Sequence, residues 1–485
     1  MMTTPSKPPT STTGPAPPIT SDWLRSQLAN CGDVTIKPMI RYANDETANT
    51  LHYIIAYVPG MVDFKFMQSL FGSDGSLLFD VKANPLVQPI MHGENGNSGE
   101  NGGKQIFDRL FAGQIIMLSE ASGEVFSIDS PGQPARSIEE STLELSVKGP
   151  RDGFVETLAV NLSLIRKRLR TTKLAMEWFK IGSESRTEIC LLYMEGITSP
   201  EVVEEARKRL RNIDVLVLHG AGELEAIIAD RSVAMVPTID YVGRPDFVVQ
   251  SLMNGRFAIM VDGSPAALIA PVNISILVKS PEDAYLPFYF VSFERFIRLV
   301  SFLLSGTLPG FWLALLAFNN DQVPFPLLAT VTMSRLGLPL SPQMELVLMI
   351  FMFEIFREAG VRLPRAVGQT VTVVGGLIVG DAAIRAGLTS PTMLVITAVT
   401  AVATFTLVNQ SLNGSVTVIR LFIILASAVL GLFGFFISVF AVMLYLCSLE
   451  SFGMPFMQPL APFEFRKLFT ALLQLPWKYR AKRNS

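Results

Sequence analysis

The chain has 485 residues, of which 17% are charged, whereas about 25% are charged in an average soluble domain. The charges are unevenly spread. The segment from Tyr285 to Ser485 has 14 basic and 8 acidic residues, a net charge of +6, and the first 284 residues have a net charge of −8. This asymmetry excludes a single soluble globular protein, and it also excludes a protein that is embedded in a membrane throughout. The total of −2 gives no support for nucleic-acid binding.

Side chains that bind metals or carry out catalysis are sparse. The three cysteines, Cys31, Cys190 and Cys447, form no CxxC pair, and the three histidines lack ligand spacing. The sequence shows no phosphate-binding glycine loop and no nucleophile–base pair. We therefore expect no metal, no cofactor and no enzymatic activity. We expect the cysteines to be reduced thiols in a protein that faces the cytosol.

Two segments are predicted to lack regular structure. Residues 1–21 are rich in Pro, Ser and Thr and predict a disordered tail. This tail has no apolar region of the kind found in signal peptides, so we expect the domain that follows to stay in the cytoplasm. Gly93–Lys104 contains no apolar residue and is interpreted as a long exposed loop.

Strand and helix patterns alternate after the tail and predict an α/β fold. Leu51–Val58 and Glu188–Met194 are short apolar runs, each ended by a turn signal and followed by a helical stretch. The helix after the second run starts near Pro200, with acidic residues first and basic residues last, as the helix dipole favours.

Two stretches of this part are similar to each other. Leu110–Asp129 and Leu252–Pro271 both place a leucine and a glycine before a strand, a glycine-containing turn and a second strand. Tyr193 follows Tyr57 by 136 positions, and Gly255 follows Gly113 by 142. The near-equal offsets predict two related α/β subdomains in tandem, over residues 22–175 and 176–285. The alternative is coincidence between two ordinary strand–turn–strand stretches.

A basic stretch, Gly149–Lys173, lies between these repeats. After an amphipathic start it has five basic residues, Arg166, Lys167, Arg168, Arg170 and Lys173. One interpretation is a helix that docks on a partner or on anionic lipid. The other is the solvated face of a linking helix.

Residues 286–465 predict an all-α domain that crosses a membrane several times. Phe296–Phe318, Thr389–Val408 and Leu421–Leu449 are long enough for a bilayer core that needs about 20 residues. The last run has 29 uncharged residues and predicts one long tilted helix. Val367–Ala386 is the best fourth span. Met344–Glu358 is then interpreted as a partly buried or interfacial helix, or as half of a re-entrant pair.

The orientation follows from the basic tail over residues 466–485, which the positive-inside rule places in the cytoplasm. The N-terminal domain lacks an export signal, so we expect both termini on the cytoplasmic side. Two ends on one side require an even number of full crossings.

Several charged residues fall within the membrane half, where charge is costly and usually faces protein or water. The charges at helical spacing are Glu354 and Glu358 with Arg357 and Arg362, and Asp381 with Arg385. They are either anchors at the membrane interface or the lining of a polar pathway.

A glycine-rich stretch over residues 367–380 lies beside these charges. It has three uncharged polar residues, Gln369, Thr370 and Thr372, which fit the wall of an oligomeric pore. Its glycines also fit a helix that serves only for close packing. Together with Glu354 and Asp381, these three residues are the polar-pathway candidates.

Long motifs in several places carry a resemblance to a known family. The membrane half contains PFYFVSFERFIRLVSFLLSGTLPGFWLAL, FEIFREAGVRLPRAVGQTVTVVGGLIVGDAAIRAGLTSP and LESFGMPFMQPLAPF. The soluble half contains AYVPGMVD, KGPRDGFVETLAVNLSLIRKRLR, LLYMEGITSPEVVEEARKRL and GRFAIMVDGSPAALIAP. Over roughly Tyr53–Phe465 the chain resembles the A subunit of the GerA-type germinant receptors of bacterial endospores.

This resemblance implies a cytoplasmic domain of two α/β subdomains and a multi-span domain in the spore inner membrane. It implies a permease-like B subunit, which binds the nutrient, and a lipoprotein C subunit as partners. It also implies a homo-oligomer of A subunits, for instance a pentamer. The expected function is a nutrient-gated channel that releases monovalent cations and initiates germination. The alternatives are a membrane-anchored scaffold of the receptor complex and a secondary transporter of the nutrient.

Overall fold

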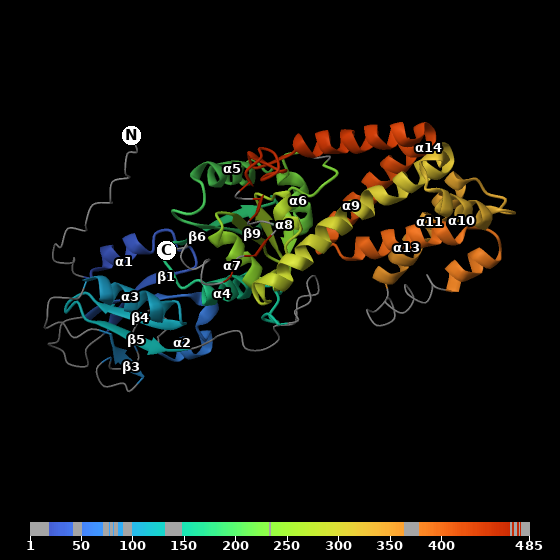
Figure 1. Cartoon of the computed structure of the whole chain (residues 1–485). Helices are drawn as coiled ribbons and strands as arrows, with labels where there is room; N and C mark the ends of the chain where they lie inside the picture. The colour runs from blue at the N-terminus through green and yellow to red at the C-terminus, as the bar shows by residue number, and fades with distance from the viewer. Residues whose placement is uncertain are drawn as a thin grey trace, which may run out of the picture. The chain divides into compact units, whose positions relative to one another are not determined.

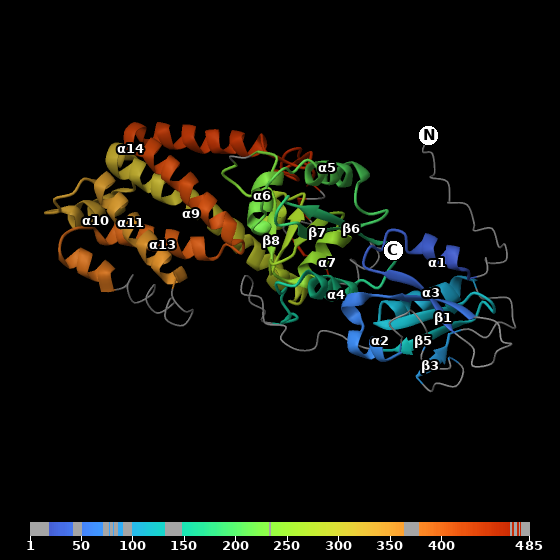
Figure 2. The same ribbon diagram turned by 180° about the vertical axis from the view of Figure 1, so that it is seen from behind.

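The computed structural model describes residues 19–41, 51–70, 77, 81, 86–90, 99–130, 148–231, 234–362, 378–465, 468–469, 473–474 and 476. The chain forms two compact units. The first, called here the α/β unit, comprises Met1–Leu145, Pro150–Ile228 and Val242–Ile269. The second, called the helical unit, comprises Ser146–Gly149, Ala229–Tyr241 and Ala270–Ser485. Figures 1 and 2 show the elements of both units from opposite sides.

The first half of the α/β unit is a five-stranded antiparallel sheet in the order β1-β2-β4-β5-β3. Its strands are β1 (Thr35–Arg41), β2 (Leu51–Tyr57), β3 (Val87–Pro89), β4 (Gln114–Ser119) and β5 (Val125–Asp129). Its helices are α1 (Ser21–Gln27), α2 (Phe64–Leu70) and α3 (Gly99–Leu110).

The second sheet also has five strands, in the order β6-β7-β9-β10-β8, with antiparallel β6–β7 and β7–β9 pairs. Its strands are β6 (Leu174–Ile181), β7 (Thr187–Met194), β8 (Asp240–Val242), β9 (Phe257–Val261) and β10 (Ala267–Ala270). The helices here are α4 (Leu158–Arg168), α5 (Pro200–Arg211), α6 (Ala221–Ile228) and α7 (Pro245–Met253).

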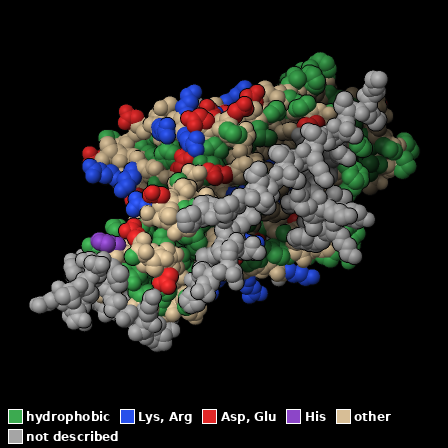
Figure 3. All heavy atoms as spheres, turned by 90° about the vertical axis from the view of Figure 1, so that its left-hand side faces the viewer, with side chains coloured by type: hydrophobic (Ala, Val, Ile, Leu, Met, Phe, Trp, Pro, Cys, Tyr) green, Lys and Arg blue, Asp and Glu red, His purple; other side chains and the backbone are tan. Residues whose placement is uncertain are grey.

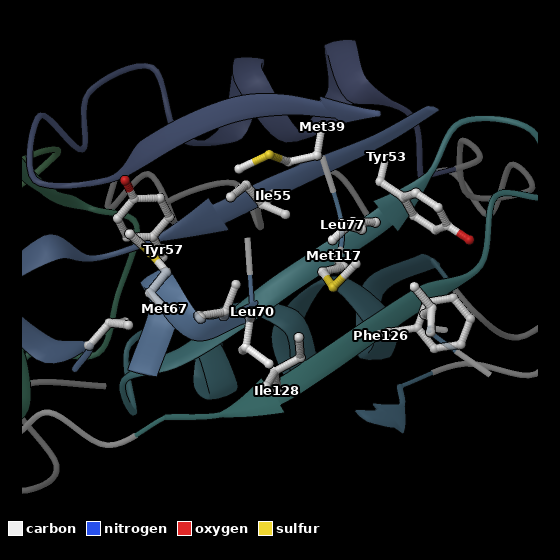
Figure 4. Close-up of a cluster of buried hydrophobic side chains, with 13 residues drawn as sticks. Met39, Tyr53, Ile55, Tyr57, Met67, Leu70, Leu77, Met117, Phe126 and Ile128 are labelled. Atoms are coloured by element: carbon white, nitrogen blue, oxygen red, sulfur yellow. The ribbon is translucent and has the colours of Figure 1, made fainter. Parts of the chain in front are cut away.

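The centre of the first sheet is buried on both faces, which explains why residues 53–57 of β2 are a continuous apolar run, whereas His52 near the start of the strand is exposed. Successive residues of a strand point to opposite faces. Tyr53, Ile55 and Tyr57 belong to one core with Met117 on β4, as Figure 4 shows. Ile54 and Ala56 belong to the other core, and α1 and α3 pack on that face. A strand with cores on both sides needs apolar residues at every position.

The two sheets have the same strand order after renumbering, which confirms the predicted tandem arrangement. Gly113 and Gly255 precede β4 and β9, and their φ angles of +93° and +84° suit glycine. A Cβ on Gly113 would lie 2.8 Å from the Met61 carbonyl oxygen, and one on Gly255 would lie 3.2 Å from that of Ile197. Met61 lies four residues after Tyr57, and Ile197 lies four residues after the matching Tyr193, so both repeats use the same close approach.

The structure corrects the loop predicted over Gly93–Lys104. Residues 99–104 form the first half of α3, and Gly102 and Gly103 are buried. A Cβ on Gly103 would lie 3.0 Å from the Trp23 ring, which stacks on Phe107 of α3 at 5.7 Å between centroids. Glycine therefore permits the approach of α1 to α3 here. Residues 1–18 and 93–98 of the two predicted irregular segments lie outside the described residues.

The helical unit has long helices packed on α9 (Phe288–Phe318). The others are α10 (Phe325–Arg335), α11 (Pro342–Arg362), α13 (Pro391–Phe405) and α14 (Gln410–Cys447), and a further helical segment covers residues 378–385. The short elements are α8 (Ile274–Leu277), β11 (Glu450–Ser451) and β12 (Met454–Pro455). Figure 1 shows α9 and α14 lying along each other.

The single long helix predicted over Leu421–Leu449 is wrong, because α14 reverses direction at Gly431. Gly431 has φ +63° and ψ −142°, a backbone conformation that residues other than glycine scarcely adopt. A Cβ on Gly434 would collide with the carbonyl oxygen of Ala426, which lies eight residues earlier and could not be near in a straight helix. Hydropathy does not detect this turn, since every residue around it is apolar or small.

The first part of α14, residues 410–430, runs parallel to α9 and the second part, residues 432–447, runs back. Gly310 lies against Ile423 and Phe318 lies against Gly431, so both helices advance together. After the reversal, the Phe435 ring is 5.3 Å from that of Phe311.

The two ends of α14 meet the same segment of the helical unit, Ala229–Tyr241. Asn409 precedes α14, and its Nδ2 donates to Asp240 at 2.6 Å. The Tyr445 hydroxyl, near the other end, accepts from the Met235 amide at 2.8 Å. The helix pair therefore leaves this segment and returns to it.

Candidate functional site

Three charged residues of the helical unit form a cluster, called here the Glu354 triad: Glu354 and Arg357 on α11, and Arg420 on α14. Glu354 and Arg357 are three residues apart and pair on one helix face. The other carboxylate oxygen of Glu354 lies 3.5 Å from Nη2 of Arg420. One carboxylate thus serves two guanidinium groups.

Hydroxyl groups complete the surroundings of the triad. Thr417, one turn before Arg420, accepts hydrogen bonds from Arg357 at 3.2 Å and from Arg420 at 3.3 Å. Thr404 on α13 accepts from Nη1 of Arg420 at 3.3 Å. The Arg420 side chain is only 5% exposed, and its Nε has no hydrogen-bond partner. Three helices therefore converge on one buried guanidinium group.

A cavity of about 610 Å³ opens beside the triad within the helical unit. Its polar lining includes Glu354, Arg357 and Arg420, and also Asp381 from the helical segment 378–385. Its other described walls are mainly apolar side chains of α11 and α13. Two of the five predicted pathway residues, Glu354 and Asp381, are thus brought to one cavity.

The remaining predicted site residues are placed as follows. Asp381 and Arg385 form an ion pair, and their side chains are 54% and 77% exposed. Glu358 is exposed on α11. Gln369, Thr370 and Thr372 lie outside the described residues, as does the side chain of Arg362.

A second buried charge lies at the other end of α11. Glu345 is fully buried, and its Oε1 accepts from the Ser390 amide at 2.6 Å and from the Thr389 hydroxyl at 3.1 Å. Ser390 is the N-cap of α13, so the carboxylate lies at a helix N-terminus, which favours negative charge. Arg335 at the end of α10 is 3.6 Å from the second oxygen of Glu345. Glu345 therefore ties α10, α11 and α13 together.

Sequence reasoning missed Arg420 and did not single out Glu345. The apolar run was taken to begin at Leu421, directly after Arg420, which placed the charge outside the predicted span. An available signal was the Thr417–Arg420 spacing on a face otherwise rich in small and apolar residues. Glu345 differs from Glu354 by lacking a basic residue at helical spacing; its partner Arg335 comes from another helix.

Helix α4 contains part of the predicted basic stretch. At Arg166 and Arg168 it fits neither predicted role, because both side chains pair with carboxylates of the α/β unit. Arg166 is fully buried and forms two hydrogen bonds with Asp33, at 2.7 and 2.5 Å, while its guanidinium lies 4.4 Å from the centre of the Phe111 ring. Arg168 pairs with Asp152 at 2.6 Å. Lys167 is exposed. The helix therefore directs part of its positive charge inward, where it joins the two sheets.

Glu177 on β6 of the second sheet shows how an ion pair changes a pKa in the α/β unit. Burial alone would raise the pKa of Glu177, but hydrogen bonds from Arg207 and Tyr193 outweigh burial and lower it. Burial and the same carboxylate raise the pKa of Tyr193 to about 12. Figure 3 shows acidic and basic side chains close together on one face of the molecule.

The described residues contain no group of three or more His, Cys, Asp or Glu side chains that could hold a metal ion. Two of the described helices, Phe288–Phe318 and Ser411–Cys447, are long and apolar enough by length and composition to cross a membrane, and the 37 residues of the second include the reversal at Gly431. The span predicted over Thr389–Val408 corresponds to α13, whose 15 residues give about 22 Å at 1.5 Å per residue, less than the bilayer core of about 30 Å.

The fold and the buried charges define a class: a protein that joins a two-sheet α/β unit to a helical unit with apolar helices of membrane length. The family model described as "Bacillus/Clostridium GerA spore germination protein" matches residues 22–485. The chain therefore belongs to the GerA spore germination protein family.

Two relatives of similar length agree with this membership. Spore germination protein XA of Bacillus anthracis is 36% identical over 95% of this chain and 94% of its own length. Spore germination protein KA of Bacillus subtilis is 34% identical over 95% and 84%. A crystal structure of the N-terminal domain of the A subunit of a Bacillus megaterium spore germinant receptor covers 54% of this chain and 98% of its own, with 27% identity and a TM-score of 0.37.

Proposed function

We propose that this chain is the A subunit of a nutrient germinant receptor and forms an oligomeric, nutrient-gated channel for monovalent cations. Membership of the spore germination family supports the process. The observation that carries the channel role is the convergence of Glu354 and Asp381 on one cavity of the helical unit, which also contains the long apolar helices α9 and α14. Charge at such depth is retained mainly where it faces protein or a water-filled path.

The assembly we propose is a homo-oligomer of A subunits, for instance a pentamer, together with the permease-like B subunit and the lipoprotein C subunit. The complex lies in the spore inner membrane with both termini of this chain on the cytoplasmic side. The return of α14 to the segment where it started supports this orientation, because a helix pair that goes and returns keeps the two ends on one side.

Nutrient binding on the partner subunit would shift a closed–open equilibrium of the helical unit. The polar side chains that we assign to the cation path are Glu354, Gln369, Thr370, Thr372 and Asp381. The Glu354 triad fits a role in this shift, since it joins α11, α13 and α14 and a movement of any one helix alters its contacts.

Cation release from nutrient-triggered spores tests this function. Thr370→Trp and Thr372→Trp are expected to reduce the rate of K⁺ release at least about tenfold with a normal amount of assembled receptor. Val399→Trp is the matched control, because Val399 is an exposed residue of α13 outside the cavity lining. Unchanged release in all three variants would contradict the channel.

The two alternatives give different results. A scaffold would still support release after residues 367–380 are replaced by an unrelated spanning helix, whereas a channel would not. A secondary transporter would carry labelled nutrient into vesicles that contain this chain alone.

A further inference from the structure

The cavity beside the Glu354 triad combines two properties that together define a ligand. Its described walls are mainly apolar, from residues such as Leu394, Ala398 and Ala401. Its volume of about 610 Å³ lies in the range of small-molecule sites, about 300–1,000 Å³. A purely apolar molecule would pack against the walls but would leave the charged side chains at one end of the cavity without a counter-charge.

The charges at that end do not balance. Glu354 shares its single negative charge between Arg357 and Arg420. The remaining acidic group of the described lining, Asp381, is paired with Arg385 and is half-exposed. The triad therefore carries one positive charge in excess, within a set of helices where uncompensated charge is costly.

Arg420 supplies the second observation that points to a ligand. Its side chain is 95% buried, lines the cavity, and leaves Nε without a partner. Arg357 and Arg420 also contact Glu354 and Thr417 through the ends of their guanidinium groups. A planar carboxylate can accept two hydrogen bonds from one guanidinium, with a geometry that lysine cannot reproduce.

We propose that this cavity binds a monoanionic amphiphile, an apolar chain or ring bearing one carboxylate. The carboxylate lies against Arg420 and neutralises the triad, and the apolar body fills the space along α11 and α13. This goes beyond the channel proposal, because it concerns equilibrium binding to this chain alone and holds whether or not the chain conducts ions.

Equilibrium dialysis of radiolabelled decanoate against the full-length chain in lipid nanodiscs tests the proposal, with empty nanodiscs to subtract partition into lipid. At pH 8 the probe is ionised, since carboxyl groups titrate near pH 4. We expect saturable binding of one decanoate per chain, and at least about tenfold weaker binding of decanamide, because a hydrogen-bonded charge is lost.

Two substitutions on α13 locate the binding. Ala401→Phe fills the cavity and is expected to weaken decanoate binding at least tenfold, whereas Val399→Phe, on an exposed position outside the lining, is expected to leave it unchanged. Equal binding of decanoate and decanamide would overturn the proposal, and so would equal effects of the two substitutions. If Ala401→Phe fails to fold, the comparison of the two probes on the unmodified chain still decides.

Discussion

Both units contain a buried arginine, and the two differ in how completely their environment satisfies it. Arg166 in the α/β unit has a carboxylate of its own, Asp33, a carbonyl acceptor on Thr171 and the face of Phe111. Arg420 in the helical unit shares Glu354 with Arg357 at a longer distance and keeps an unpartnered nitrogen.

This difference separates a structural ion pair from a site that can bind a ligand or allow its helices to move. A fully matched buried pair has a single good arrangement and so fixes the sheets it joins. A shared carboxylate with an unused donor can accept a ligand or a new helix position without first breaking a complete network. We therefore expect stability to depend on the first cluster and function to depend on the second.

The largest effect is expected from Arg166→Met, which leaves the Asp33 carboxylate buried and unpaired. The free energy of unfolding of the α/β unit should fall by about 3–5 kcal/mol. Hydrogen exchange of peptides from β2 and β7 in the full chain measures this loss. Lys167→Met, at the exposed neighbouring position, should change it by less than about 0.5 kcal/mol. Similar exchange in both variants would remove Arg166 from its structural role.

Glu345→Gln tests whether Glu345, the second buried charge of the helical unit, has a structural role like that of Arg166. The change removes the attraction to Arg335 and weakens the bonds to Thr389 and Ser390, so we expect a loss of about 1.5–3 kcal/mol. Thermal unfolding of the full chain in nanodiscs provides the measurement, with the exposed Asp321→Asn as the control. A stability equal to that of the control would show that Glu345 does not hold the helices together.

Gly431→Ala addresses the reversal of α14. The φ of +63° and a Cβ 2.9 Å from that of Phe318 make alanine unfavourable there, by about 1–3 kcal/mol. Gly414→Ala lies in the same helix with open space around it and should be neutral or stabilising by up to about 1 kcal/mol. Thermal unfolding that ranks the two variants in the opposite order would argue for a straight α14.

The smallest expected effect concerns the order in which the three cysteines react with a thiol reagent. Burial raises the pKa of Cys31 to about 11, so at pH 8 only about one molecule in a thousand carries its thiolate, and buried Cys190 has a raised pKa as well. Cys447 is exposed. Iodoacetamide at pH 8 should therefore modify Cys447 first, as read by mass spectrometry of the full chain. Prior modification of Cys31 would show that the junction of the two sheets opens readily.

The sequence predicted most of the α/β fold, because the apolar runs over Leu51–Val58 and Glu188–Met194 and the repeated glycines Gly113 and Gly255 reflect local geometry. It missed the N-terminal half of α3, since helix formation there depends on the packing of Gly103 against Trp23, a contact distant in sequence.

The candidate site was predictable only where partners share a helix. The spacing of Glu354 and Arg357 is visible in the sequence. The roles of Arg420 and Glu345 depend on residues of other helices, and the reversal at Gly431 depends on backbone angles that hydropathy does not report.

The most direct test of the central claim modifies the cation path after assembly. Spores whose receptor has Thr372→Cys would be treated with a positively charged methanethiosulfonate reagent and then triggered with nutrient while K⁺ release is recorded, with Val399→Cys spores as the control. A channel predicts at least about tenfold slower release in treated Thr372→Cys spores and no change in the control. Equal release from both treated strains, with the Thr372→Cys thiol shown to be modified, would contradict a cation path through this part of the chain.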